Sequence, residues 1–242
     1  MSDDKPLAGR LALVTGASRG IGRSVTLAFA KAGAHVILMA RTVGALEELD
    51  DQVRALGGTA TLLPLDLSKV DKLDALGPTI LQRWEKLDIF VANAGVLGPL
   101  SPLGHITTQS WREVIDINLT ANWHLIRALE PLLKRSDAGR AIFVSSGAAS
   151  GRNAYWGPYA VSKAGVEALA RTWANELANT SVRVNIVNPG PIRTQMRAKA
   201  YPGENPAILK TPDDIAPLFV KLASPAWNQT GRIHDFKTGE VR

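Results

Sequence analysis

The sequence contains no cysteine among its 242 residues. Disulfide bonds and thiolate chemistry are therefore excluded, and this absence is compatible with the reducing cytoplasm, where we expect the protein to reside. No apolar run approaches the roughly 18 residues that a membrane span requires. The first ten residues, MSDDKPLAGR, lack the apolar core of a secretory signal peptide, so none is expected.

Charge of one sign is not concentrated in a stripe. The chain has 28 Lys and Arg against 22 Asp and Glu, a net charge of +6, but its basic residues are scattered. A nucleic-acid-binding domain gathers basic residues and interleaves them with aromatic ones, so nucleic-acid binding is not expected. The four histidines show no ligand spacing, and no metal site is predicted.

Apolar runs alternate with stretches of helical spacing along the whole chain. Strands are predicted over 10–14, 35–40, 60–65, 87–92, 140–145, 182–187 and 233–236. The central runs are continuously apolar, as expected when both faces of a parallel sheet are covered. Helices are predicted over 19–33, 42–56, 68–86, 108–135, 157–179 and 211–223. The fold class is therefore α/β, a Rossmann-type doubly wound, mostly parallel seven-stranded sheet with helices on both faces.

Local signals mark the ends of several predicted helices. Thr42 and Ser68 are expected to cap the helices that follow them, and Gly57-Gly58 to end the first of these. Thr211-Pro212 is expected to open the last helix. No repeat or linker divides the chain, so residues 1–242 are predicted to form one domain, with a short irregular substrate loop at about 191–212.

A glycine-rich stretch, TGASRGIG at 15–22, lies between the first predicted strand and the first predicted helix. Glycines there permit a tight turn and close approach of the backbone to a phosphate, and the N-terminus of a helix attracts negative charge. This position is where a dinucleotide meets such a fold. The candidate contacts are Gly16, Ser18, Arg19, Gly20, Ile21 and Gly22.

The second predicted strand ends without the carboxylate that binds the ribose 2′-hydroxyl of NAD. Arg41 follows this strand instead, and Arg19 lies in the glycine turn. Two guanidinium groups suit a 2′-phosphate, so we predict NADP(H) in preference to NAD(H).

Tyr159 and Lys163 are four residues apart in a predicted helix and therefore share one helix face. A phenol ordinarily titrates near 10, and a neighbouring ammonium group lowers that pKa. The pair is therefore a candidate acid/base unit, with an expected depressed pKa of Tyr159.

With these stretches placed, the chain resembles the main branch of the short-chain dehydrogenase/reductase family over about residues 8–231. The further motifs that carry the resemblance are Asp66-Leu67, Asn93-Ala94-Gly95, Asn118, Ser146 thirteen residues before Tyr159, and Pro189-Gly190. The family transfers hydride between a nicotinamide and a carbonyl or alcohol. The resemblance implies a catalytic set of Asn118, Ser146, Tyr159 and Lys163.

The resemblance also implies roles for individual residues. Ser146, rather than Ser145, would hold the substrate carbonyl while Tyr159 donates a proton. Lys163 would hold the ribose hydroxyls, and Asn118 would kink its helix and position a water that leads to Lys163. The cofactor contacts implied elsewhere are Asp66 and Leu67 at the adenine, Asn93, Ala94 and Gly95 beside the ribose, and Ile192 and Thr194, after Pro189-Gly190, at the carboxamide.

The resemblance implies a homodimer or homotetramer. Trp123, Leu125, Trp173 and Leu177 are expected to be available for the dimer surface. The C-terminal segment departs from the family pattern because it keeps only Thr230-Gly231 and a late glycine, Gly239. That departure puts the usual tetramer contact in doubt.

Substrate choice is expected to come from the loops around 148–158 and 193–210. Trp156, Met196 and Tyr201 could line an apolar pocket, whereas Arg193, Arg197 and Lys199 could meet an anionic group. Three functions remain open. They are a carbonyl reductase, a 3-oxoacyl thioester (acyl-carrier-protein) reductase, and a non-catalytic NADP-binding regulatory protein.

Overall fold

Seven parallel strands form one sheet in the order β3-β2-β1-β4-β5-β6-β7. The computed structural model describes residues 5–242; the first four residues of the N-terminal stretch, expected not to be a signal peptide, lie outside the described residues. The strands are β1 (Leu11–Thr15), β2 (His35–Ala40), β3 (Thr59–Pro64), β4 (Ile89–Ala92), β5 (Arg140–Val144), β6 (Arg183–Asn188) and β7 (Ile233–Asp235). The predicted fold class is confirmed.

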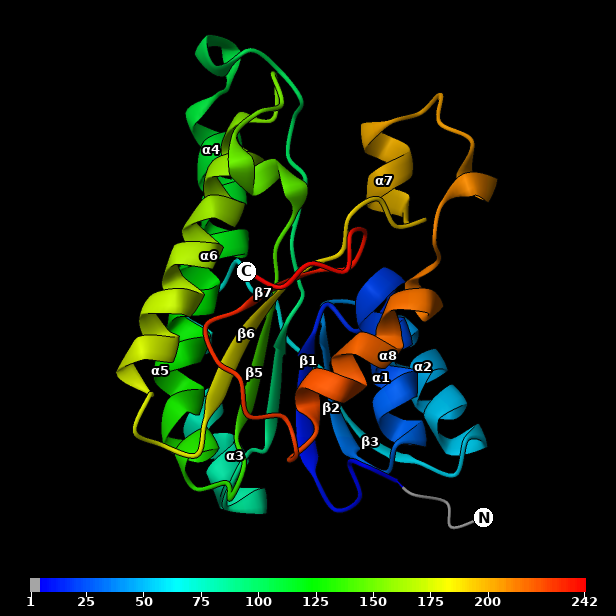
Figure 1. Ribbon diagram of the computed structural model, residues 1–242, viewed down its shortest axis with the longest axis vertical. Helices are drawn as coiled ribbons and strands as arrows, with labels where there is room; N and C mark the ends of the chain where they lie inside the picture. The colour runs from blue at the N-terminus through cyan, green and yellow to red at the C-terminus, as the bar shows by residue number, and fades with distance from the viewer. Residues whose placement is uncertain (1–4) are drawn as a thin grey trace.

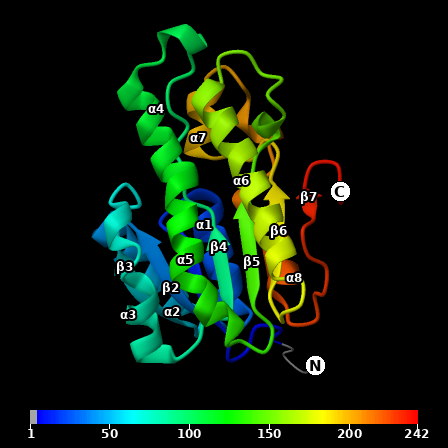
Figure 2. The ribbon, with the colours of Figure 1, turned by 90° about the vertical axis from the view of Figure 1, so that its left-hand side faces the viewer.

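Helices cover both faces of this sheet, as Figures 1 and 2 show. One layer contains α1 (Gly20–Lys31), α2 (Val43–Ala55) and α8 (Pro212–Ala223). The other contains α3 (Leu76–Trp84), α5 (Ala121–Lys134) and α6 (Gly157–Glu176), with α4 (Thr108–Ile115) continuing above α5. The short α7 (Gln195–Ala200) lies beyond the carboxyl ends of the strands.

Neighbouring residues of the central strands point into two separate cores. Leu13 and Phe90 pack with α3, α5 and α6, whereas Val14 and Val91 pack with α1, α2 and α8. Because both faces are buried, these strands contain no alternating polar positions, which is why their sequences are continuously apolar. Phe143 packs edge-on against both Phe90 and Trp173 in the first core.

The helix predicted over 68–86 is present only in its second half, as α3, and the predicted Ser68 cap is wrong. A 3-10 turn covers Val70–Lys72, α3 starts only at Leu76, and the Ser68 backbone instead donates a hydrogen bond to Asp66. Pro78 explains the late start, because a proline lacks the N–H group needed beyond the first helical turn.

Two other local predictions need correction. Thr42 does precede α2, but within the described part of the chain its side chain makes no capping hydrogen bond. The region 191–210 is less irregular than expected, since it contains α7 and a 3-10 turn over Pro206–Ile208.

The last three residues of the chain pair with β7. The Ile233 N–H donates to the Arg242 carbonyl at 2.8 Å, and the Arg242 N–H donates back to Ile233 at 3.0 Å. A third bond joins the Asp235 N–H to the Glu240 carbonyl at 2.9 Å. This antiparallel tail covers the edge of the sheet that β7 would otherwise expose.

Thr211 begins α8 with a capping box, as the sequence predicts. Its hydroxyl accepts from the Asp214 N–H, and the Asp214 carboxylate accepts from the Thr211 N–H. Thr211→Ala should therefore lower the free energy of unfolding by about 1 kcal/mol, measured by urea denaturation. Thr42→Ala is the matched control and should change it far less; equal losses would contradict the assignment.

Candidate functional site

The turn between β1 and α1 has no room for side chains at two glycines. Gly16 has a φ of 64°, and a Cβ there would lie 2.9 Å from the Ala94 Cα. A Cβ at Gly22 would overlap the carbonyl oxygen of Gly16. The first turn of α1 holds no acidic residue, and among the described residues no side chain caps it through Arg19. Its free N–H groups and compact turn fit the pyrophosphate of a dinucleotide.

Thr15 and Asn93 join the carboxyl ends of β1 and β4. The Thr15 hydroxyl accepts from the N–H groups of Asn93 and Ala94, both at 3.0 Å, and donates to the Val91 carbonyl at 3.2 Å. The Asn93 amide donates to the Thr15 carbonyl at 2.8 Å. Thr15 is a site residue for which no role was predicted; its signal in the sequence is a hydroxyl group directly after the first apolar run. These bonds fix the two strand ends at which the order of the sheet reverses.

Asn118 lies in a π-helical turn, Asp116–Thr120, between α4 and α5. Its side chain is fully buried and bonds to both the N–H and the carbonyl of Val96, and to the Ser162 hydroxyl at 3.0 Å. The wide turn interrupts the helical ladder, as expected where an amide enters a functional site. The Asn118 carbonyl accepts from the Asn122 amide at 2.7 Å, a contact that the sequence analysis missed.

Lys163 and Tyr159 lie on one face of α6 beside the end of β5. The Lys163 ammonium is 5.7 Å from the centre of the Tyr159 ring and donates to the Val144 carbonyl at 2.8 Å. Both side chains are nearly buried, with 4% and 7% of their surfaces exposed. Gly95 provides space here, since a Cβ there would lie 3.2 Å from the Asn118 amide oxygen and 3.7 Å from the Lys163 Nζ.

Burial controls the protonation of this pair. It raises the pKa of Tyr159 above its ordinary value, and the hydrogen bond with the Ser146 hydroxyl opposes this only in part. Burial lowers the pKa of Lys163 to about 8. The expected depression of the Tyr159 pKa is therefore wrong for the chain on its own, because the cost of removing a phenolate from water outweighs the effect of the Ser146 hydroxyl. Near neutral pH the phenol stays protonated.

Arg41 and Arg19 are both exposed at the carboxyl edge of the sheet, after β2 and before α1. The Arg19 guanidinium donates to the Gln195 amide oxygen at 3.2 Å, which joins the glycine turn to α7. Asp66 follows β3 beside Arg41. The Ser68 N–H and, to a lesser degree, Arg41 hold the pKa of the Asp66 carboxyl below its usual value. Arg41 and Asp66 thus lie on the β2–β3 side of the glycine turn, whereas the Arg19 guanidinium is bonded to α7.

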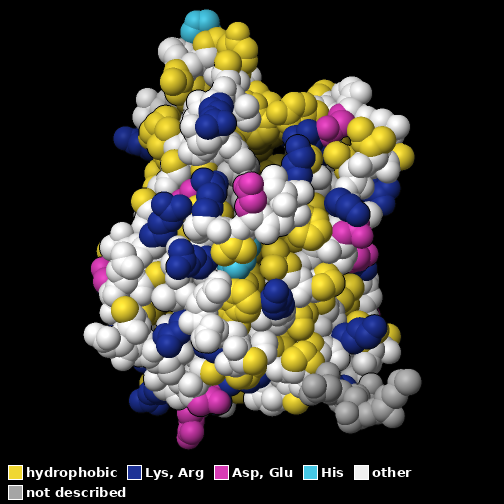
Figure 3. Space-filling view, in the orientation of Figure 1, with side chains coloured by type: hydrophobic (Ala, Val, Ile, Leu, Met, Phe, Trp, Pro, Cys, Tyr) yellow, Lys and Arg dark blue, Asp and Glu magenta, His cyan; other side chains and the backbone are white. Residues whose placement is uncertain are grey.

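The segment after β6 passes over Tyr159. Beyond Pro189-Gly190, Ile192 is buried, and the Thr194 hydroxyl caps α7 by accepting from the Arg197 N–H at 3.1 Å. Figure 3 shows a hollow between α7 and the upper part of α6, with hydrophobic side chains on its walls.

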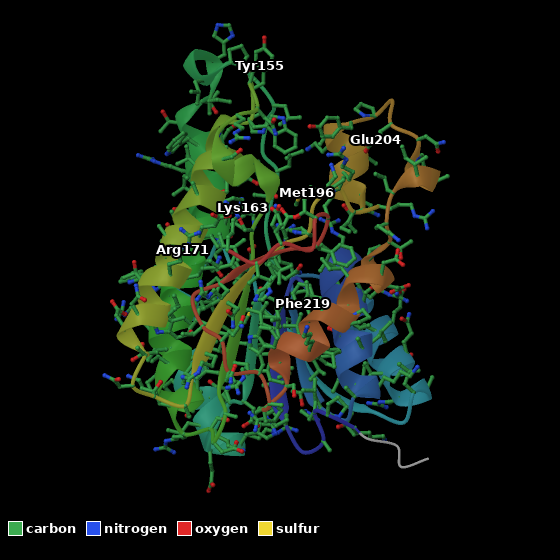
Figure 4. All side chains as sticks on the ribbon, in the orientation of Figure 1. Tyr155, Lys163, Arg171, Met196, Glu204 and Phe219 are labelled. Carbon is green, nitrogen blue, oxygen red and sulfur yellow. The ribbon has the colours of Figure 1, made fainter. Side chains whose placement is uncertain are left out.

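Apolar and aromatic groups form the surroundings of Tyr159. Met196 and Trp156 pack against the small cluster that contains Tyr159, and Met196 is on the α6 side of α7 (Figure 4). The Trp156 ring lies 5.7 Å from that of Tyr159 and 5.8 Å from that of Tyr201. The three residues expected at an apolar pocket are therefore brought together.

Arg197 is already paired. Its Nε and one terminal nitrogen each lie 2.6 Å from a carboxylate oxygen of Glu204, and its guanidinium stacks 3.7 Å from the centre of the Tyr201 ring. This pairing raises the pKa of Arg197 and lowers that of Glu204. The expectation that Arg197 meets an anionic substrate is not supported, because its bidentate site is filled by the chain itself.

Three of the four residues expected on the dimer surface are internal. Leu125, Trp173 and Leu177 are buried in the core between the sheet and α5 and α6, with Trp173 only 2% exposed. Trp123 is 45% exposed and stacks with Arg127 on the outer side of α5. The sequence showed helical apolar positions, but it did not distinguish the sheet-facing positions from the outward ones.

The chain matches the family model described as short chain dehydrogenase over residues 10–205. It is 38% identical over 234 residues to the uncharacterized oxidoreductase YciK of Escherichia coli, covering 95% of this chain and 92% of that protein. It is 36% identical to a 3-oxoacyl-[acyl-carrier-protein] reductase of Synechocystis, covering 78% and 77% of the two chains.

Solved structures agree with this similarity. A short chain dehydrogenase of Shigella flexneri complexed with NADP superposes with a TM-score of 0.92 at 38% identity, over 96% of this chain and 98% of that one. A short chain dehydrogenase of Escherichia coli complexed with NADPH gives the same score and identity, over 97% and 99% of the two chains.

The buried Lys163 should make stability depend on pH in a defined window. Below about pH 8 the folded and the unfolded chain both carry this proton, so the cost of burying the ammonium is fully present. Between about 8 and the ordinary 10.5, the folded chain releases the proton first, and its stability rises with pH. The difference in unfolding free energy between Lys163→Met and wild type should therefore shrink across this window. A constant difference would show that Lys163 titrates normally.

Proposed function

The chain belongs to the short chain dehydrogenase family of oxidoreductases, and from that premise we propose that it reduces an uncharged carbonyl substrate with NADPH. The observation that carries this proposal is the buried phenol of Tyr159, 7% exposed, with the Lys163 ammonium 5.7 Å from its ring centre and the Ser146 hydroxyl beside it. Burial raises the pKa of this phenol and so favours its protonated form. A phenol held in its protonated form is suited to donate to a developing alkoxide.

Each residue of the set has a defined part in this reaction. The Ser146 hydroxyl donates a hydrogen bond to the carbonyl oxygen, and Tyr159 transfers its proton to that oxygen as the alcohol forms. NADPH, when bound, supplies the hydride. The Lys163 ammonium stabilises the phenolate that remains, and Asn118 holds the proton route behind Lys163. Trp156 and Met196 keep water from the phenol.

The glycine turn and the segments that follow β2, β3, β4 and β6 would hold the cofactor. Support for NADP(H) comes from the exposed Arg19 and Arg41, which suit a 2′-phosphate, and from the NADP and NADPH named for two similar structures. Asp66 and Leu67 would contact the adenine, Asn93, Ala94 and Gly95 the neighbouring ribose, and Ile192 and Thr194 the carboxamide. Lys163 would also hold ribose hydroxyls.

We propose an apolar group next to the reacting carbonyl. The side chains that surround Tyr159 are Trp156, Met196 and Ala200, and Arg197 is neutralised by Glu204. A 3-oxoacyl thioester is the second candidate, favoured by the similarity to the Synechocystis reductase. An NADPH-oxidation panel of ketones, aldehydes and 3-oxoacyl thioesters, with NADH in parallel, separates the two. If NADPH were oxidised only in the presence of charged 2-oxo acids, both candidate substrates would be contradicted.

A homodimer through the outer faces of α5 and α6 remains our proposal for the assembly. It is supported by the exposed Trp123 on α5 and the exposed Val161 on α6. The tail over β7 argues against assembly through that edge, and so favours a dimer over a tetramer. Monomers in sedimentation equilibrium would contradict this assignment.

Within residues 5–242 no helix is both long and apolar enough to cross a membrane, and the cytoplasmic location stays a prediction.

Replacing Tyr159 by Phe removes the proton donor and keeps the ring. We expect turnover with any accepted carbonyl to fall by about 10²–10⁴-fold, which is the usual contribution of a general acid. NADPH affinity, measured by fluorescence titration, should change little. Tyr155→Phe removes an exposed hydroxyl from the adjacent loop and is the control. Wild-type rates in Tyr159→Phe would refute the assignment.

Replacing Arg41 by Ala tests the cofactor preference. Loss of a charge-assisted hydrogen bond to a 2′-phosphate should weaken NADPH binding by about 10–100-fold. NADH binding should not change, because NADH lacks that phosphate. Arg171→Ala, on the outer side of α6, makes the same charge change at a remote exposed site. Equal effects on NADPH and NADH would mean that Arg41 does not read the phosphate.

A further inference from the structure

Three consecutive residues at the end of β5 lie against one face of α6. The Val144 carbonyl accepts from Lys163 at 2.8 Å, and the Ser145 hydroxyl donates to the Glu167 carboxylate at 2.6 Å. The Ser146 hydroxyl, next along the chain, lies close enough to Tyr159 to lower the pKa of its phenol. The α6 partners are residues 159, 163 and 167, spaced by one helical turn, so they form a single row. Two members of this row belong to the proposed reaction. Glu167 is the third.

The Ser145–Glu167 contact is well placed to affect Ser146. Ser145 is 1% exposed, and its N–H bonds to the Val187 carbonyl of β6 at 2.8 Å, so its backbone is held by the sheet. Its side chain bonds to Glu167, which is half-buried one turn beyond Lys163. Ser146 follows directly, and its hydroxyl also accepts from the Ala148 N–H at 3.2 Å. The direction in which the chain leaves β5 therefore sets the position of the Ser146 hydroxyl.

We propose that Glu167 is a positioning residue, which acts through Ser145 to hold the Ser146 hydroxyl against Tyr159. This inference rests on the proposed reductase function. Without the carboxylate, the Ser145 hydroxyl loses its side-chain partner, and of these three residues Val144 alone keeps a hydrogen bond to α6 within the described part of the chain. A displacement of about 1 Å at a reacting group costs on the order of 10²-fold in rate.

The test compares two substitutions of Glu167 by their kinetics. Glu167→Leu cannot accept the Ser145 proton and should lower kcat by about 10–100-fold, with KM for NADPH unchanged. Glu167→Gln keeps an accepting oxygen and should stay within about threefold of wild type. Ser145→Ala should match Glu167→Leu, and the double variant should lose no more than either single one, since both remove the same bond.

Glu176→Leu, an exposed position on the same helix, is the matched control and should leave kcat unchanged. Melting temperatures recorded for all variants separate stability from rate. The proposal is overturned if Glu167→Leu lowers only the melting temperature, or if its losses add to those of Ser145→Ala.

Crystal structures of the two Glu167 variants provide a readout that does not depend on activity. The Ser146 hydroxyl should be displaced from Tyr159 in Glu167→Leu and retained in Glu167→Gln. An undisplaced hydroxyl in Glu167→Leu overturns the positioning role. A wild-type protein that reduces no carbonyl overturns the proposed function instead, and the displacement then still decides whether Glu167 orders the end of β5.

Discussion

The burial of one ammonium group organises the site. Lys163 is 4% exposed, and within residues 5–242 its ammonium makes one hydrogen bond, to the Val144 carbonyl. A buried cation is costly, and burial lowers its pKa to about 8. The surrounding elements are arranged around it. A Cβ at Gly95 would lie close to both the Asn118 amide oxygen and the Lys163 ammonium. The polar groups and the space without a side chain are therefore both found around this buried charge.

A second constraint acts on the strand ends. The carboxyl ends of parallel strands meet at one edge, and Thr15 and Asn93 bond them where the strand order reverses. The glycine turn therefore follows a strand whose end is held by hydrogen bonds, and the proposed acid, Tyr159, lies on α6. The segment that contains α7 is held differently, by the contact of Trp156 with Tyr201 and by the ion pair of Arg197 with Glu204. The reacting groups therefore lie on elements that hydrogen bonds join, whereas the substrate side is held by aromatic packing and an ion pair.

The sheet could be predicted because its strands are continuously apolar, and the motif residues because their order and spacing are specific. What failed depended on three-dimensional context. Pro78 delays the start of α3, burial raises the pKa of Tyr159, and Glu204 pairs with Arg197 from seven residues away. Helical periodicity placed Leu125 and Trp173 on apolar helix faces, but it could not predict that these faces pack against the sheet. Ser145 and Glu167 are 22 residues apart, and only the packing of α6 on β5 joins them.

The tail on β7 has a consequence for how the chain is handled. Residues 240–242 are joined to β7 by three backbone hydrogen bonds, and any treatment that displaces them presents the unpaired backbone groups of β7. Another chain could then pair with the open edge. A purification tag attached directly to Arg242 would extend from a paired strand rather than from a free end, and would compete with the bonds to Ile233 that close the edge.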